Sequence, residues 1–135
     1  MSEFVTLDQI KDSGLKQEVV EVPEWGGIVR VRELTADERD EYEQSLMEAR
    51  RFGKKIEVKP NFKSAKAKIV CKCIIDEAGN RMLADKDVLW VGKKSSAVLN
   101  RLADVIQRLS GMMEKDLEDL EGNSGTGQSE DSSSD

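Results

Sequence analysis

The sequence contains no histidine, only two cysteines and only six aromatic residues among its 135 residues. Without histidine, the chain lacks the commonest general base and the usual partner of a serine or cysteine nucleophile. It also has no glycine-rich loop with a phosphate-binding pattern. These absences argue against an enzyme and lead us to expect no cofactor.

Long apolar runs are missing as well. No segment approaches the roughly 18 apolar residues of a membrane span, and the N-terminus lacks the basic start and apolar core of a secretory signal. Cys71 and Cys73 are separated by a single residue, a poor spacing for a disulfide within one regular element. A structural zinc site needs about four ligands. We therefore expect a cytosolic protein whose two thiols are free and buried.

Negative charge is concentrated near the C-terminus. Residues 112–135 carry a net charge of −7, so residues 1–111 are nearly neutral at +1. Residues 50–72, by contrast, hold nine bases against one acid, Glu57. This stretch indicates either contact with an acidic partner or nucleic acid, or a solvated loop and helix face. Nucleic acid is the weaker option because few aromatic side chains accompany the bases.

Turn signals and apolar periodicity predict an α+β fold that is predominantly helical, with an N-terminal β-hairpin followed by about four helices. Two β-branched runs flank a Pro/Gly-rich connection and predict the hairpin over residues 17–33. Thr35 and Glu38 have the spacing of a capping box, which predicts a helix over 35–51. Further helices are expected at 63–75, at 86–91 with Asp85 as its cap, and at 96–109. Residues 56–58 indicate at most a short edge strand.

The chain divides into a lead-in segment at 1–16, a single domain at 17–121 and an acidic Ser/Gly-rich tail at 122–135. Phe4, Leu7 and Ile10 are the expected apolar anchors of the lead-in. Residues 112–121 indicate one or two acidic helical turns. The tail contains no apolar residue, and we expect it to be disordered because it cannot offset its ordering entropy by burial.

Six apolar side chains are candidates for binding a partner. The helix expected at 96–109 carries an apolar stripe, which forms either a core face or a binding face for another helix. The two tryptophans present the same choice between burial in the core and contact with a partner. The candidate partner-binding residues are Trp25, Trp90, Val98, Leu102, Val105 and Leu109.

Several short motifs follow one another in a recognisable order and spacing. They are VPEWGG at 22–27, VRVRELT at 29–35, CIIDEAGNR at 73–81, LADVIQRLSG at 102–111 and DLEDLEGNS at 116–124. Over about residues 17–124 this order resembles the tail assembly chaperones of long-tailed, siphovirus-type bacteriophages. The lysine-rich segment at 50–62 departs from the pattern of that family.

The resemblance implies a non-enzymatic protein that binds the tape measure protein in the host bacterial cytoplasm. Such a protein keeps the tape measure protein soluble while the tail tube polymerises, and is absent from the mature virion. In many members of the family a ribosomal frameshift produces a longer form that recruits the tail tube protein. Self-association is a further expectation. The alternatives are a module that binds nucleic acid or an acidic partner through residues 50–72, and a minor structural tail subunit.

Overall fold

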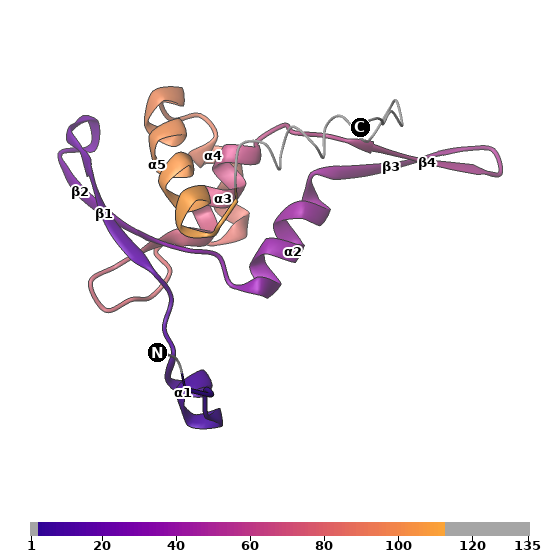
Figure 1. The fold of residues 1–135 in the computed structure, drawn as a ribbon. Helices are drawn as coiled ribbons and strands as arrows, with labels where there is room; N and C mark the ends of the chain where they lie inside the picture. The colour runs from indigo at the N-terminus through magenta and orange to yellow at the C-terminus, as the bar shows by residue number, and fades with distance from the viewer. Residues whose placement is uncertain (1–2, 113–135) are drawn as a thin grey trace, which may run out of the picture.

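The computed structural model describes residues 3–112 and combines five α-helices with two small antiparallel sheets. About 45% of the structure is helical and 25% is strand, so the expected mixture of helix and strand is found, with more strand than the sequence indicated. Figure 1 shows a body built around α3 and α5, from which α1 and the β3–β4 hairpin extend in different directions. The elements are α1 (Leu7–Asp12), β1 (Gln17–Val22), β2 (Gly27–Arg32), α2 (Ala36–Ser45), β3 (Met47–Phe52), β4 (Lys55–Pro60), α3 (Ala65–Cys73), β5 (Ile74–Ile75), α4 (Val88–Val91) and α5 (Ser96–Leu109).

The predicted N-terminal hairpin is confirmed. β1 and β2 pair along six positions, from Gln17 opposite Arg32 to Val22 opposite Gly27. A 3₁₀ turn, Pro23–Trp25, joins them, and Gly26 closes the turn at a φ of 87°, a left-handed conformation that glycine adopts without strain. β5 adds a third strand, which the sequence analysis did not predict, to the free edge of β2.

The capping box at the start of α2 is also confirmed. The Thr35 hydroxyl accepts from the Glu38 amide at 3.1 Å, and the Glu38 carboxylate accepts from the Thr35 amide at 3.0 Å. Arg32, the last residue of β2, donates to both Glu38 oxygens at 2.7 and 2.9 Å. These bonds fix the end of the sheet against the first turn of the helix.

The prediction that this helix continues to residue 51 is wrong, because α2 ends at Ser45 and the chain becomes strand at Met47. β3 pairs with β4 along six positions, and Gly53 takes a φ of 62° in the turn between them. Ala49 and Phe52 are exposed in this strand. The backbone pairing with residues 55–60 takes the place of the last turns of the predicted helix, and the short strand expected at 56–58 lies within β4.

The core lies between α3, α5 and the inner face of the β1–β2 hairpin. α3 ends two residues before the predicted boundary, because Ile74 and Ile75 pair with β2 instead. Cys71 and Cys73 are free and buried, as predicted. The completely buried apolar side chains include Val22, Val31, Leu46, Ile69, Val70, Val98, Leu102 and Ile106.

Asp85 does not cap a helix, contrary to the prediction. It begins a 3₁₀ turn, Asp85–Asp87, and its carboxylate accepts hydrogen bonds from Lys72 and Arg81. Asp87 takes the capping role by accepting from the Ala84 amide at 2.7 Å, and α4 begins one residue later.

The lead-in segment contains a helix, α1, that the sequence analysis did not predict. The Thr6 and Gln9 side chains form its capping box, but it buries no residue. Phe4, Leu7 and Ile10 are exposed, so their prediction as anchors is wrong. Among residues 3–112, no helix is long and apolar enough to cross a membrane. The helical turns and disordered tail expected beyond residue 112 lie outside the described residues.

Candidate functional site

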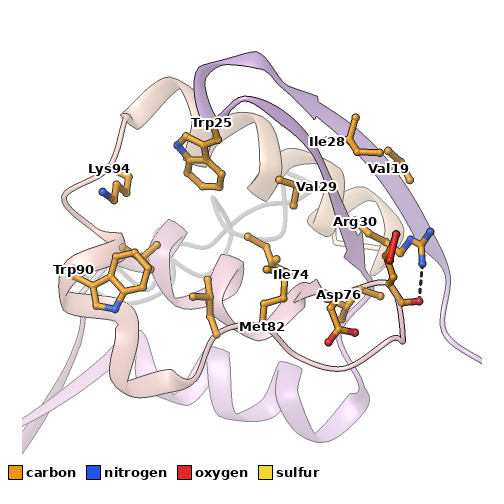
Figure 2. Close-up of a pocket in the computed structure, with 14 residues that line it drawn as sticks. Val19, Trp25, Ile28, Val29, Arg30, Ile74, Asp76, Met82, Trp90 and Lys94 are labelled. Atoms are coloured by element: carbon orange, nitrogen blue, oxygen red, sulfur yellow. Dashed lines mark hydrogen bonds between the residues drawn. The ribbon is translucent and has the colours of Figure 1, made fainter.

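An open, mostly apolar groove of about 760 Å³ lies beside the β1–β2 hairpin. One part of its wall comes from that hairpin and its turn, and the other from the segment between β5 and α4 (Figure 2). We call it the tryptophan groove, because Trp25 and Trp90 both line it. Its other lining residues are Val19, Ile28, Val29, Arg30, Ile74, Ile75, Asp76, Glu77, Met82, Leu83, Val91 and Lys94.

Trp25 stands at the end of the hairpin turn and is 41% exposed. The turn is tied to α5 by the neighbouring Glu24, whose carboxylate accepts two hydrogen bonds from Arg101 at 2.8 and 2.9 Å. These hydrogen bonds hold the pKa of Glu24 at about 2, so the carboxylate is ionised at neutral pH. The ion pair therefore fixes the turn that carries the Trp25 indole.

Trp90 lies on α4 and is 50% exposed. Its indole N–H donates to Asp87 at 2.9 Å, and the Lys94 ammonium lies 5.8 Å from the ring centroid, within the range of a cation–π contact. Hydrogen bonds from the Ala84 amide and from Trp90 keep the pKa of Asp87 below its usual value. The indole is thus held in one orientation while half of its surface is open to solvent.

Charged side chains and a fixed turn form another part of the groove. Figure 2 shows Arg30 and Asp76 well separated from the two indoles, with Arg30 bonded to the Glu77 carbonyl. That bond is 3.3 Å long, and the Asp76 carboxylate accepts from the amides of Ala78 and Asn80 at 2.9 Å. The turn is therefore held by its own hydrogen bonds.

The structure separates the six predicted partner-binding residues into two groups. Trp25 and Trp90 line the same groove, and their exposure rules out the alternative that each is a buried core tryptophan. Val98 and Leu102 are completely buried, whereas Val105 and Leu109 are partly buried against the core. In this fold the stripe on α5 is therefore a core face.

The sequence analysis missed several apolar groove residues, among them Val19, Ile28 and Met82. All three are exposed. A signal was present in β1, where Val19 precedes Val20 and breaks the alternation of apolar and polar positions. Strands that are apolar on both faces are typical of sheets covered on both faces, so the pair indicated a second contact surface.

The bases of the stretch at 50–72 lie in different settings. Lys72 is 6% exposed and its ammonium lies 3.0 Å from Glu41, whereas Lys68 donates to the Ser45 carbonyl at 2.9 Å. Burial works against the charged form of Lys72, but the carboxylates of Glu41 and Asp85 outweigh it and raise its pKa. Lys72 is thus engaged within the body, whereas Lys63 and Lys66 are exposed and the bases at 50–59 lie on the β3–β4 hairpin.

The two thiols are poor nucleophiles. Burial raises the pKa of Cys71 to about 11 and that of Cys73 to about 12, so almost no thiolate is present at neutral pH. Within residues 3–112 no group of three or more potential metal ligands comes together. The tryptophan groove itself offers apolar contact, two half-exposed indoles and a few charged side chains.

Comparison with known proteins places the chain in a family. No curated protein and no solved structure matches the chain significantly. The family model described as phage tail assembly chaperone matches residues 6–123, which is most of the chain and includes both walls of the groove. The match confirms the resemblance seen in the sequence motifs. This chain therefore belongs to the phage tail assembly chaperones.

Proposed function

We propose that this protein binds the tape measure protein through the tryptophan groove and keeps it soluble while the tail tube polymerises. The observation that carries the proposal is the pair of half-exposed indoles in one apolar groove on a chain of this family. Tryptophan is enriched where protein interfaces concentrate their binding energy, because it combines a large apolar area with a hydrogen-bonding N–H.

The physical basis is the burial of an apolar stripe on another polypeptide. A long amphipathic helix has a stripe that it cannot bury by itself, and helices of this kind bind in apolar grooves through residues at helical spacing. Many copies of a small protein could cover such a helix along its length. The chaperone performs no catalysis in this account and needs no cofactor.

Charge supports the same role. The excess of acid at residues 112–135 gives each copy a net negative charge, and like charge favours solubility when many copies crowd on one partner. We place this activity in the host bacterial cytoplasm and expect the protein to be absent from the mature virion. Self-association and a frameshifted longer form that contacts the tail tube protein are further parts of the proposal.

Co-expression with the tape measure protein tests the proposal. The wild-type chaperone should keep the tape measure protein in the soluble fraction and co-purify with it. The double variant Trp25→Ser/Trp90→Ser should lose this activity while remaining folded. Leu89→Ser is the matched control, because Leu89 lies on the same short helix as Trp90 and is more exposed, but does not line the groove. Equal activity of the double variant and the wild type would refute the assignment of the groove.

The two alternative functions, nucleic-acid binding and a structural role in the tail, predict different experimental results. Binding of nucleic acid would weaken steeply with ionic strength, whereas apolar capture of a helix would not. Lys72 is buried and paired with Glu41, so this base of the 50–72 stretch is not available to a nucleic acid. A minor structural subunit would be found by mass spectrometry in purified virions, and the proposed chaperone would not.

A further inference from the structure

Two elements project from the body and bury none of their large apolar side chains. One is residues 3–12, which contain α1 and which we call the N-terminal segment. The other is the β3–β4 hairpin, which we call the arm. α1 buries no residue, and Ile56 and Val58 of the arm are 65% and 54% exposed. Figure 1 shows α1 and the arm extending from the body in different directions.

The arm has one mainly apolar face. Ladder pairs place Ala49 opposite Val58 and Arg51 opposite Ile56 on this face, because side chains alternate between the two faces of a strand. A two-stranded hairpin without packing is marginally stable in water. Among the described strands, none pairs with either edge of the arm. A partner that packs on the apolar face would therefore stabilise the arm.

The arm is also basic, which restricts the chemistry of its partner. Residues 47–60 hold five bases and two acids, a net charge of +3. Arg51 lies on the apolar face itself and Lys54 lies in the turn. Within residues 3–112, neither side chain takes part in an ion pair. The partner of this face should combine exposed apolar side chains with an excess of acid.

The N-terminal segment has this composition. It holds three acids and one base, a net charge of −2. In the part of the chain that the structure describes, Asp8 and Asp12 take part in no ion pair. The segment has four large apolar side chains, and all are exposed: Phe4, Val5, Leu7 and Ile10.

The segment presents these side chains on a helix that is already formed. The capping box at its start holds the first turn of α1. Leu7 and Ile10 are three residues apart and share one face of the helix, whereas Asp8 and Asp12 are four residues apart and share another. The helix therefore has an apolar face to pack on the arm and an acidic face beside the contact.

We infer that the N-terminal segment of one copy packs on the apolar face of the arm of a second copy. The apolar face of α1 contacts Ile56 and Val58. The stems of Arg51 and Lys54 lie along this contact and their charged ends reach the acids of α1, as long basic side chains do at apolar surfaces. The opposite net charges of the segment and the arm favour their encounter.

The contact joins two different surfaces, so each copy offers its arm to one neighbour and its N-terminal segment to another. Repetition of such a contact builds a ring or an open row of copies. A row suits a chaperone that covers a long helix. The inference rests on the self-association proposed above and names its surfaces, but it does not involve the tryptophan groove.

Charge reversal with complementation tests the inference in the full chain. The wild type should associate in analytical ultracentrifugation as its concentration rises. Asp8→Lys/Asp12→Lys and Arg51→Glu/Lys54→Glu should each associate on the order of tenfold more weakly, because attractive pairs become repulsive. An equimolar mixture of the two variants should associate like the wild type, since each N-terminal segment then meets an arm of opposite charge. Rescue by mixing also shows that both variants are folded.

Matched variants separate this contact from net charge and from general hydrophobicity. Lys86→Glu/Lys93→Glu makes the same charge change as the arm variant at exposed lysines outside the contact and should associate like the wild type. Ile56→Ser/Val58→Ser should weaken association. Leu89→Ser removes an apolar side chain that is more exposed than either and should not weaken it.

Failure of this inference is distinguishable from failure of the proposed function. Association that neither charge reversal weakens would overturn the inference, as would a mixture that associates no better than the separate variants. A wild type that stays monomeric at its highest soluble concentration would overturn it too. None of these results decides whether the groove captures the tape measure protein. In that co-expression test, Trp25→Ser/Trp90→Ser should lose binding and should still associate with itself like the wild type.

Discussion

The ion pair between Arg32 and Glu38 gives the sharpest test of how the sheet is joined to α2. Both side chains are largely buried, at 10% and 16% exposure, and the pair is bidentate. Glu38→Ala removes the carboxylate that also accepts from the Thr35 amide. Losing a capping interaction costs about 1 kcal/mol. Leaving a fully buried partner unpaired costs roughly 3–5 kcal/mol, and the partial exposure of Arg32 reduces that cost to about 2 kcal/mol.

We therefore expect Glu38→Ala to lower the free energy of unfolding by roughly 3 kcal/mol, measured by urea denaturation, and to lower Tm by about 10 °C or more. Asp37→Ala is the control, because Asp37 lies in the same helical turn and makes no side-chain hydrogen bond or ion pair within the described residues. A loss of less than about 0.5 kcal/mol for Glu38→Ala, no larger than that of the control, would refute this reasoning.

Three further predictions concern the core, the thiols and pH. Leu102→Ala should destabilise the protein by roughly 2–5 kcal/mol in urea denaturation because the side chain is completely buried, whereas Val105→Ala should cost clearly less. Cys71 and Cys73 should react with a thiol reagent at neutral pH only as fast as the protein unfolds, and rapid labelling of the native protein would contradict their burial. Burial works to raise the pKa of Glu38, but hydrogen bonds from Arg32 and Thr35 lower it overall, so the folded state binds fewer protons at this site than the unfolded state. The resulting stability should be complete above about pH 5 and fall as pH drops through the lowered pKa, and Glu38→Gln should flatten this dependence in a pH series of thermal melts.

Local sequence signals predicted those parts of the fold in which short-range and tertiary interactions favour the same secondary structure. The capping box at Thr35, the hairpin turn at Gly26 and the apolar face of α5 each have a short-range cause that survives in the folded chain. The family motif at 102–111 begins within α5, the longest of the described helices, and ends two residues beyond it.

Prediction failed where a non-local partner decided the outcome. Residues 47–51 continue a helical pattern, but pairing with residues 55–60 makes them a strand. Ile74 follows α3 and becomes strand because β2 has a free edge beside it. Aspartate is a residue type that commonly caps helices. The Asp85 carboxylate instead accepts hydrogen bonds from Lys72, which lies on α3, and from Arg81, which is near it in sequence.

The candidate site was predicted only in part for the same reason. Trp25 and Trp90 stood out as large apolar residues, but their separation by 65 positions gave no sign that they line one groove. Their exposure became visible only once α4 and the hairpin turn were placed. Val98 and Leu102 were candidates because a core face and a binding face share one periodicity.

Intrinsic fluorescence tests the central claim most directly, because the only two tryptophans of the chain both line the groove. Titration with a tryptophan-free segment of the tape measure protein should shift the emission of the chaperone to shorter wavelength as the half-exposed indoles are buried. The shift should persist at high salt and should also be seen in both single-tryptophan variants, Trp25→Phe and Trp90→Phe, because each retained indole lines the groove. Binding of that segment with unchanged tryptophan emission would contradict the assignment of the groove as the surface that captures the tape measure protein.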